Sequence, residues 1–193
     1  TCYSRMKKAK NHHNIPQAVI DVEHTDNIVT LFLRRGKSES LKRFHPWVFS
    51  GAIAGANGKL NEGDIVRVVS NEGELMGYGH YQIGSIAVRM LTFDDEPIDR
   101  NFWQTRLAEA FRLRKALMLY RLVHGEGDRL PGLVVDVYGR TAVMQAHSVG
   151  MHVCREDIAE ALVAASEGLI QNVYYKSETT LPFKAGLNQE NEF

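Results

Sequence analysis

The stretch GDIVRVVSNEGELMGYGHYQIGSIAVRMLTF, residues 63–93, contains three short runs of alternating or β-branched residues with turn residues between them. Residues 64–69, 75–81 and 86–93 are each long enough for a strand, and a Ser-Asn-Glu-Gly-Glu turn separates the first two. Short strands at close, regular spacing are typical of a small β-barrel or sandwich. The stretch therefore predicts a small β-barrel, and the two glycines of the middle run predict bends or bulges in it.

The segment before this stretch predicts one more strand and little other regular structure. Residues 28–33 alternate as a strand does, and the basic turn Arg34-Arg35-Gly36-Lys37 follows them. Residues 38–49 predict a short helix interrupted at His45-Pro46, because proline disfavours helical geometry in the residue before it. Residues 50–58 are small and rich in glycine, so they predict a loop.

A different pattern begins after Asp94-Asp95-Glu96-Pro97. Residues 99–120 repeat apolar side chains at helical spacing, with Asp99 as the N-cap. Residues 133–146 predict a hairpin, residues 154–168 a second helix and residues 172–176 a final strand. The second half is therefore expected to be an α+β layer of about three strands and two helices.

These patterns divide the chain into four segments. We expect a tail of uncertain order over residues 1–28, because this segment is polar and weakly patterned. The small β-barrel domain is predicted over 29–94 and the α+β domain over 97–185. Residues 186–193 are expected to be a linker.

Composition excludes several classes of protein. The chain has 193 residues, 44% hydrophobic and 24% charged, which is ordinary for a globular protein. No apolar run approaches the roughly 20 residues that span a bilayer, and no signal peptide is visible, so we expect a cytoplasmic protein without a membrane partner. Cys2 and Cys154 cannot form a disulfide framework, and Cys154 falls in a helical pattern that predicts a buried apolar role. Neither cysteine has closely spaced ligands and the pair His12–His13 is a weak signal, so we predict no metal.

The net charge of zero hides two basic stretches. The first fifty residues hold nine Lys/Arg against four acids, and residues 100–121 hold six against Glu109 alone. Such stretches are either localised contacts to phosphates or ordinary solvated faces.

The first basic stretch also contains aromatic residues, namely Phe44, His45 and Trp47. Cationic groups hold phosphates and aromatic rings stack on unpaired bases, so the combination suits RNA. We expect Trp47 and Phe49 to be core residues and the basic side chains to be exposed. The candidate RNA contacts are Arg34, Arg35, Lys37, Lys42, Arg43 and His45, with Arg67 and Arg89 on the following strands.

The segment YRLVHGEGDRLPGLVVDVYG, residues 120–139, is the densest local signature. A small hydrolase using Glu126, Asp128 and His124 is one alternative function, since paired carboxylates support proton transfer. We favour a structural role, because acids in tight turns usually bond nearby backbone amides and no Ser or Cys nucleophile accompanies His124. A third alternative is a stand-alone protein-interaction module that exposes Phe44 and Trp47.

Several of these motifs together resemble a known family. The order RRGK at 34–37, HPWVFSGA at 45–52 and GDIV at 63–66 looks like the PUA domain that opens the ribosomal RNA large subunit methyltransferase I family. Residues 121–139 are similar to the signature of the same family's middle domain, and the resemblance covers residues 31–185. It implies a PUA domain that binds 23S-type ribosomal RNA, in a cytosine-C5 methyltransferase that uses S-adenosylmethionine (SAM).

The sequence departs from the family in two respects, and the first is that residues 1–28 do not match the family start. The family's Rossmann-like catalytic domain, with its cofactor glycines and its attacking cysteine, has no counterpart in this sequence, which contains no strand–glycine loop–helix signature. Neither Cys2 nor Cys154 lies in a comparable motif, so no catalytic or cofactor-binding residue is carried over. We therefore expect a chain that positions ribosomal RNA for methyl transfer by an absent C-terminal domain, that ends in a truncated linker and that is inactive alone.

Overall fold

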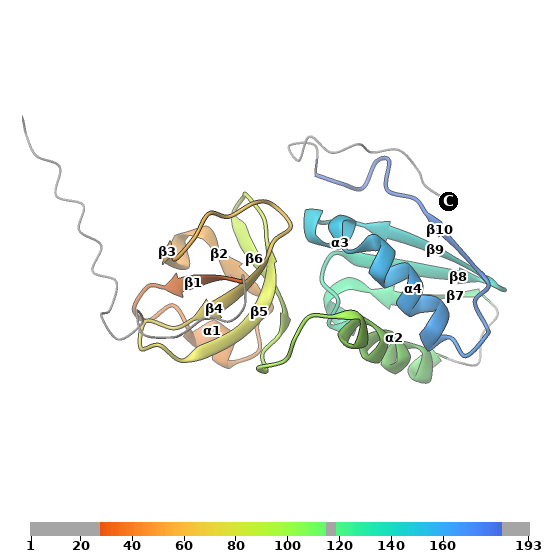
Figure 1. The fold of residues 1–193 in the computed structure, drawn as a ribbon, viewed down its shortest axis with the longest axis horizontal. Coiled ribbons are helices and arrows are strands. Elements are labelled where there is room, and N and C mark those ends of the chain that lie inside the picture. The colour runs from red at the N-terminus through yellow and green to blue at the C-terminus, as the bar shows by residue number, and fades with distance from the viewer. Residues whose placement is uncertain (1–27, 115–118, 183–193) are drawn as a thin grey trace, which may run out of the picture.

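The computed structural model describes residues 28–114 and 119–182, which form two units side by side (Figure 1). The first unit is residues 28–94 and the second unit is residues 99–182. The tail predicted over 1–28 and the linker predicted over 186–193 lie outside the described residues, except for residue 28. No helix in the described part of the chain is long and apolar enough to cross a membrane.

The first unit is a curled six-stranded sheet in the spatial order β2-β6-β5-β4-β1-β3. Neighbouring strands are antiparallel except for β1 and β4, which are parallel. The elements are β1 (Val29–Leu33), α1 (Glu39–Lys42), β2 (Trp47–Phe49), the 3₁₀ turn η2 (Ser50–Ala52), β3 (Ile53–Ala56), β4 (Ile65–Val69), β5 (Leu75–Tyr81) and β6 (Ile86–Thr92).

Side-chain alternation places the core inside this curled sheet. Val66 and Val68 of β4 are fully buried, whereas Ile65 and Arg67 are partly exposed. The predicted bends are confirmed, because strand register shifts in β5 on either side of Gly77. Gly77 has φ +119° and faces the carbonyl of the neighbouring strand, so no side chain would fit there.

Two predictions for residues 38–58 are wrong. The predicted interrupted helix over 38–49 is a four-residue helix, α1, followed by strand β2. The predicted loop over 50–58 contains the η2 turn and strand β3. Both strands are short and lie at the two edges of the sheet, where pairing with β6 and β1 overrides a weak local pattern.

The second unit is a four-stranded sheet in the order β10-β9-β8-β7, with helices packed against it (Figure 1). The long helix α2 packs on α4, and their buried faces complete a core that includes Trp103, Leu107 and Ile158. The elements are α2 (Arg100–Arg114), β7 (Leu119–His124), the 3₁₀ turn η3 (Gly125–Asp128), β8 (Leu133–Tyr138), β9 (Thr141–Ala146), α3 (Val149–Val153), α4 (Arg155–Ala165) and β10 (Asn172–Tyr175).

The α+β character of this unit is confirmed, with three differences. The helix predicted over 99–120 is shorter, because residues 119–124 form strand β7, so the unit has four strands instead of three. The helix predicted over 154–168 is α4, and a short additional helix, α3, precedes it and is separated from it by Cys154. The predicted N-cap is confirmed, since the Asp99 carboxylate accepts the Phe102 amide at 2.9 Å.

The two units meet around His80 of β5. Its imidazole is 2% exposed and stacks on Trp103 of α2, with ring centroids 6.1 Å apart and planes at 19°. Its Nε2 lies 3.6 Å from the sulfur of Cys154. Gly150 of α3 packs so closely on the ring that a Cβ there would overlap it. Leu91 of β6 joins the core of the second unit, so the contact between the units includes apolar packing.

Burial also decides the protonation of this joint. It lowers the pKa of His80 to about 4, and the nearby charge of Arg89 acts in the same direction. Burial raises the pKa of the Cys154 thiol to about 11, with Asp157 contributing. Both groups are therefore neutral at pH 7. Cys154 packs against the core of the second unit as predicted, but it is half-buried and lies between α3 and α4.

The first prediction concerns the fit at Gly150. Gly150→Ala should lower the free energy of unfolding by about 1–3 kcal/mol, because the added methyl group overlaps the His80 ring. The matched control is Gly127→Ala, whose methyl group would meet nothing within 4 Å and should change stability by less than about 0.5 kcal/mol. Urea unfolding measures both. Equal stability of the two variants would contradict the packing described.

The second prediction concerns pH. The unfolded chain binds a proton at His80 near pH 6.5, whereas the folded chain does so only near pH 4. Stability from this group is therefore complete above pH 6.5 and is lost as the pH falls toward 4, by about 2–3 kcal/mol. Between pH 7.5 and pH 4.5, His80→Phe should lose less stability in urea unfolding than the wild type, because phenylalanine does not titrate. The loss that remains comes from other groups, which titrate in both proteins. Identical losses would show that His80 is not buried neutral.

Candidate nucleic-acid interface

The basic turn is fixed by backbone hydrogen bonds. The Lys37 amide donates to the Arg34 carbonyl at 3.0 Å, and Gly36 has φ +72°, the left-handed conformation that a type II turn needs at this position. The Arg34 amide donates to the Ala52 carbonyl at 2.8 Å, and its side-chain Nε donates to the Ile53 carbonyl at 3.0 Å. These hydrogen bonds hold the turn against the start of β3, so the backbone that carries its cationic side chains has a defined position.

The predicted basic contacts differ in how their charge is compensated. Arg35, Lys37 and Arg43 are exposed, and no carboxylate within residues 28–114 and 119–182 pairs with them. Lys42, in contrast, lies 3.1 Å from Glu74, and the hydrogen bond to that carboxylate raises the pKa of Lys42. A phosphate approaching Lys42 would have to compete with this carboxylate.

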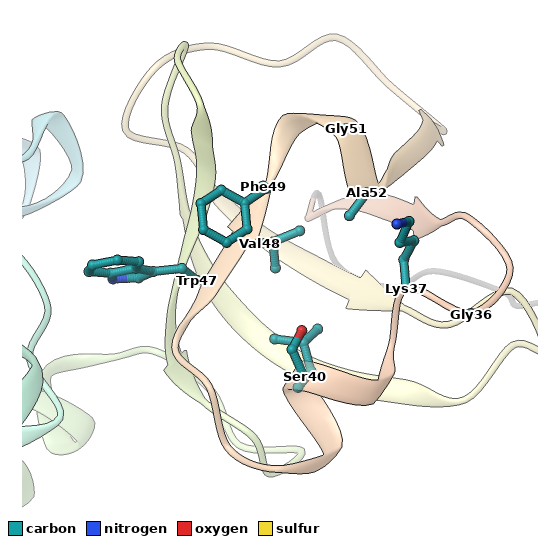
Figure 2. A pocket seen from close by; sticks show the side chains of 9 residues that line it. Gly36, Lys37, Ser40, Trp47, Val48, Phe49, Gly51 and Ala52 are labelled. Atoms are coloured by element: carbon teal, nitrogen blue, oxygen red, sulfur yellow. The ribbon is translucent and has the colours of Figure 1, made fainter.

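A pocket of about 390 Å³ lies beside the turn (Figure 2). Lys37 and Ser40 line it from the turn and α1, and Phe49 lines it from β2 on the other side. The remaining lining residues are Gly36, Leu41, Trp47, Val48, Gly51 and Ala52. Because two glycines and an alanine line the pocket, little side-chain volume fills it and a ligand has room to enter.

The prediction that Trp47 and Phe49 are core residues is wrong. Val48 is the buried residue of β2, at 3% exposed, so its two neighbours point to the opposite side of the strand. Phe49 is 50% exposed, and Trp47 is half-buried. With His45 they form an aromatic cluster whose ring centroids lie 5.7 to 6.5 Å apart.

Phe44 is a further exposed ring in an unusual backbone conformation. It has φ +60° at the C-terminal end of α1, where its amide donates to the Leu41 carbonyl at 2.8 Å. Glycine is the usual residue at such a helix end, and a bulky residue there is strained. The ring is 73% exposed and touches Phe93 edge-on at 5.3 Å.

The two remaining predicted contacts lie elsewhere. Arg67 of β4 donates to the Tyr78 hydroxyl at 3.0 and 3.2 Å and lies over that ring, and the hydroxyl in turn donates to Asp95 at 2.7 Å. Arg89 of β6 is the strand partner of Trp47 and lines a second pocket between the units. The structure therefore brings together the turn, α1 and β2, and it places Arg67 within a separate network.

The second basic stretch of the sequence is used for ion pairs within the chain. Four of its arginines pair with acids at 2.8 to 2.9 Å: Arg100 with Glu160, Arg106 with Glu96, Arg114 with Asp128 and Arg121 with Asp136. For these four arginines the pairs argue against phosphate contacts and favour the alternative, an ordinary face of the protein.

The acids of the hydrolase alternative are also occupied. Asp128 pairs with Arg114 and accepts the His124 amide at 2.6 Å, which confirms the expected bond to its own turn. Glu126 instead accepts the indole N–H of Trp47 at 3.0 Å, across 79 residues of sequence. Periodicity carries no signal for such a contact, so sequence reasoning missed it. In the described part of the chain no group of three or more His, Cys, Asp or Glu residues could hold a metal ion.

Comparison with known proteins identifies the chain's relatives. A family model described as a PUA-like domain matches residues 31–93. Ribosomal RNA large subunit methyltransferase I of Pseudoalteromonas atlantica is 38% identical over 165 residues, which cover 81% of this chain and 41% of that protein. The protein of the same name from Escherichia coli strain UTI89 is 37% identical over 169 residues, covering 82% and 42%.

The chain is a relative of ribosomal RNA large subunit methyltransferase I. The resemblance read from the RRGK, HPWVFSGA and 121–139 motifs is thus confirmed. The chain spans about two fifths of the length of these two relatives.

Solved structures share the fold. A protein from Streptococcus mutans assigned as a SAM-dependent methyltransferase has a TM-score of 0.65 at 16% identity, over 78% of this chain and 41% of that one. Another, assigned as a methyltransferase and solved in complex with SAH, has a TM-score of 0.67 at 16% identity, over 86% and 43%. At this identity the likeness concerns the fold alone.

The third prediction tests the position of Trp47. Trp103 is 2% exposed and Trp47 is half-buried at the surface, so the two tryptophans should differ in fluorescence. Trp47→Phe should shift the remaining emission to shorter wavelength and make it harder to quench with acrylamide than wild-type emission. Unchanged quenching and emission maximum would place Trp47 in the core.

Proposed function

We propose that this chain binds large-subunit ribosomal RNA and positions it for a SAM-dependent methyl transfer to cytosine C5. The RNA-binding face comprises the 34–37 turn, α1 and β2, with residues 29–94 as a PUA domain and 97–185 as a second, α+β domain. The observation that carries the proposal is a group of exposed cations, with no carboxylate partner among the described residues, beside an exposed aromatic cluster. The relatives' name supplies the type of RNA and the reaction.

The chemistry of this face fits single-stranded or structured RNA. Arg35, Lys37 and Arg43 offer charge to the sugar–phosphate chain, which supplies affinity without reading sequence. Phe49 and His45 offer ring faces on which unpaired bases can stack. Arg34 contributes less, because its Nε already donates to a carbonyl, and Lys42 contributes less because it is paired with Glu74.

SAM is the cofactor that the relationship implies, and the described residues do not match a binding site for it. The parallel crossover of the second unit runs from β9 through α3 and α4 to β10. The turn after β9 reads His147-Ser148-Val149-Gly150, without the glycine-rich loop that approaches a cofactor in Rossmann-type sites. We therefore derive no methyl-transfer step from these residues. Their role in the proposal is to position RNA, in the cytoplasm where the ribosome is made.

The fourth prediction tests the RNA-binding face. Arg35→Gln combined with Lys37→Gln should weaken binding of a ribosomal RNA hairpin, and the slope of log affinity against log salt should fall by about 1.4, since each lost phosphate contact removes about 0.7. Fluorescence anisotropy across a salt series measures this.

The matched control is Lys42→Gln. It removes one charge from the same face, but from a lysine already paired with Glu74, so the change in slope per charge should be smaller. Wild-type affinity and slope in the double variant would remove the proposed interface.

A further inference from the structure

A second pocket, of about 230 Å³, lies where the two units meet. Arg89 of β6 forms its wall on the side of the first unit, and the rest comes from the second unit. Residues 124–126 line it at the end of β7, residues 132–134 at the start of β8, and His147 just after β9.

The two histidines lie at the ends of the strands on either side of β8, His124 as the last residue of β7 and His147 just after β9. His124 is the strand partner of Val134, and the His147 amide donates to the Gly132 carbonyl at 2.8 Å. Both histidines are exposed. Desolvation lowers the pKa of His147, and the charge of Arg121 lowers it further. The exposed apolar part of the floor between them is Val134, because Leu133 is fully buried in the core and Gly125 and Gly132 carry no side chains.

The acids near this pocket already have partners. Glu126 accepts the Trp47 indole, and Asp136 holds Arg121 through two hydrogen bonds at 2.8 and 3.0 Å. A third nitrogen of that guanidinium lies 3.5 Å from Nδ1 of His124. Arg121 is therefore paired, and Glu126, which itself lines the pocket, is held in place by the Trp47 indole.

Arg89 is the cation of this pocket without an acidic partner in the described part of the chain, and one of its guanidinium nitrogens donates to the Gln82 side-chain carbonyl at 3.4 Å. It is half-buried, and no carboxylate oxygen among the described residues lies within ion-pair distance of it. Burial lowers the pKa of Arg89, an effect larger than the opposite influence of Glu126. A partly desolvated guanidinium without a carboxylate partner is well suited to a phosphate.

We propose that this pocket is a second RNA-contact site that takes one unpaired nucleotide. The base would lie on the apolar floor between the imidazoles of His124 and His147, with its edge toward polar groups of the rim, and Arg89 would hold its phosphate. An apolar floor with a few convergent polar groups is the usual composition of a small-ligand pocket, and ring stacking is the usual way in which proteins hold an unpaired base.

Continuity with the first pocket favours RNA as the occupant. Trp47 lines the first pocket, and its indole bonds Glu126, which lines the second. One strand of RNA leaving the 34–37 turn could therefore follow β2 and enter the gap between the units. This inference rests on the proposed RNA-binding function and adds that the second unit contacts the RNA directly.

The test compares two RNAs and three variants. One RNA is a fully paired ribosomal RNA hairpin closed by a short loop, and the other is the same hairpin with a single-stranded extension. His124→Ala combined with His147→Ala should weaken binding of the extended RNA about tenfold, as expected for loss of one stacked base. Binding of the unextended hairpin should stay unchanged. Arg35→Gln with Lys37→Gln should weaken binding of both RNAs.

The matched control is Gln104→Ala with Arg112→Ala, two exposed residues of α2 outside the pocket. Nuclear magnetic resonance adds a direct readout, since the Cε1–H signals of His124 and His147 should shift when the extended RNA is added to the wild type. If the histidine variant binds both RNAs as the wild type does and these signals do not move, the pocket proposal fails while the proposed function stands. If the wild-type chain binds neither RNA, the proposed function itself fails.

Discussion

His80 projects from β5 into the second unit, where Trp103 stacks on its ring and Gly150 packs against it without a Cβ, which would overlap the ring. Because the imidazole is buried and neutral, the contact resembles core packing more than a surface contact between domains. Everything that draws on both units depends on it. The indole of Trp47 reaches Glu126, and Arg89 forms one wall of a pocket otherwise built by the second unit, only while this joint holds their relative position.

Charge pairing explains how a neutral chain can offer a cationic surface. Four arginines in the first part of the second unit lie within ion-pair distance of acids. In the first unit Glu74 pairs with Lys42, and no acid of the described ranges lies within ion-pair distance of Arg35, Lys37 or Arg43. A count of charges along the sequence shows two basic stretches, and only folding shows which of them remains available to a polyanion.

Local patterns predicted the parts of the fold that local patterns determine. Alternation in β4 to β6, the cap at Asp99 and the hairpin of β8 and β9 depend on neighbours in sequence, and the structure confirms them. Strands β2, β3 and β7 were missed because each is at a sheet edge, where distant pairing partners decide the conformation. The exposure of Trp47 and Phe49 was missed for the same reason. Once β2 is a strand, Val48 alone fills the core. The residues proposed as RNA contacts stay predictions.

At Phe44 the backbone conformation and the exposed ring favour different residues. The left-handed turn that ends α1 would be relaxed by glycine, which has no Cβ to crowd the neighbouring carbonyl. Glycine would also remove the ring that now stands in solvent against Phe93. Replacing Phe44 by glycine would thus make the chain more stable and would leave less aromatic surface beside its cations. Attempts to make this protein more heat-resistant by consensus-style substitution at helix ends would therefore erode the surface on which recognition is proposed to rest.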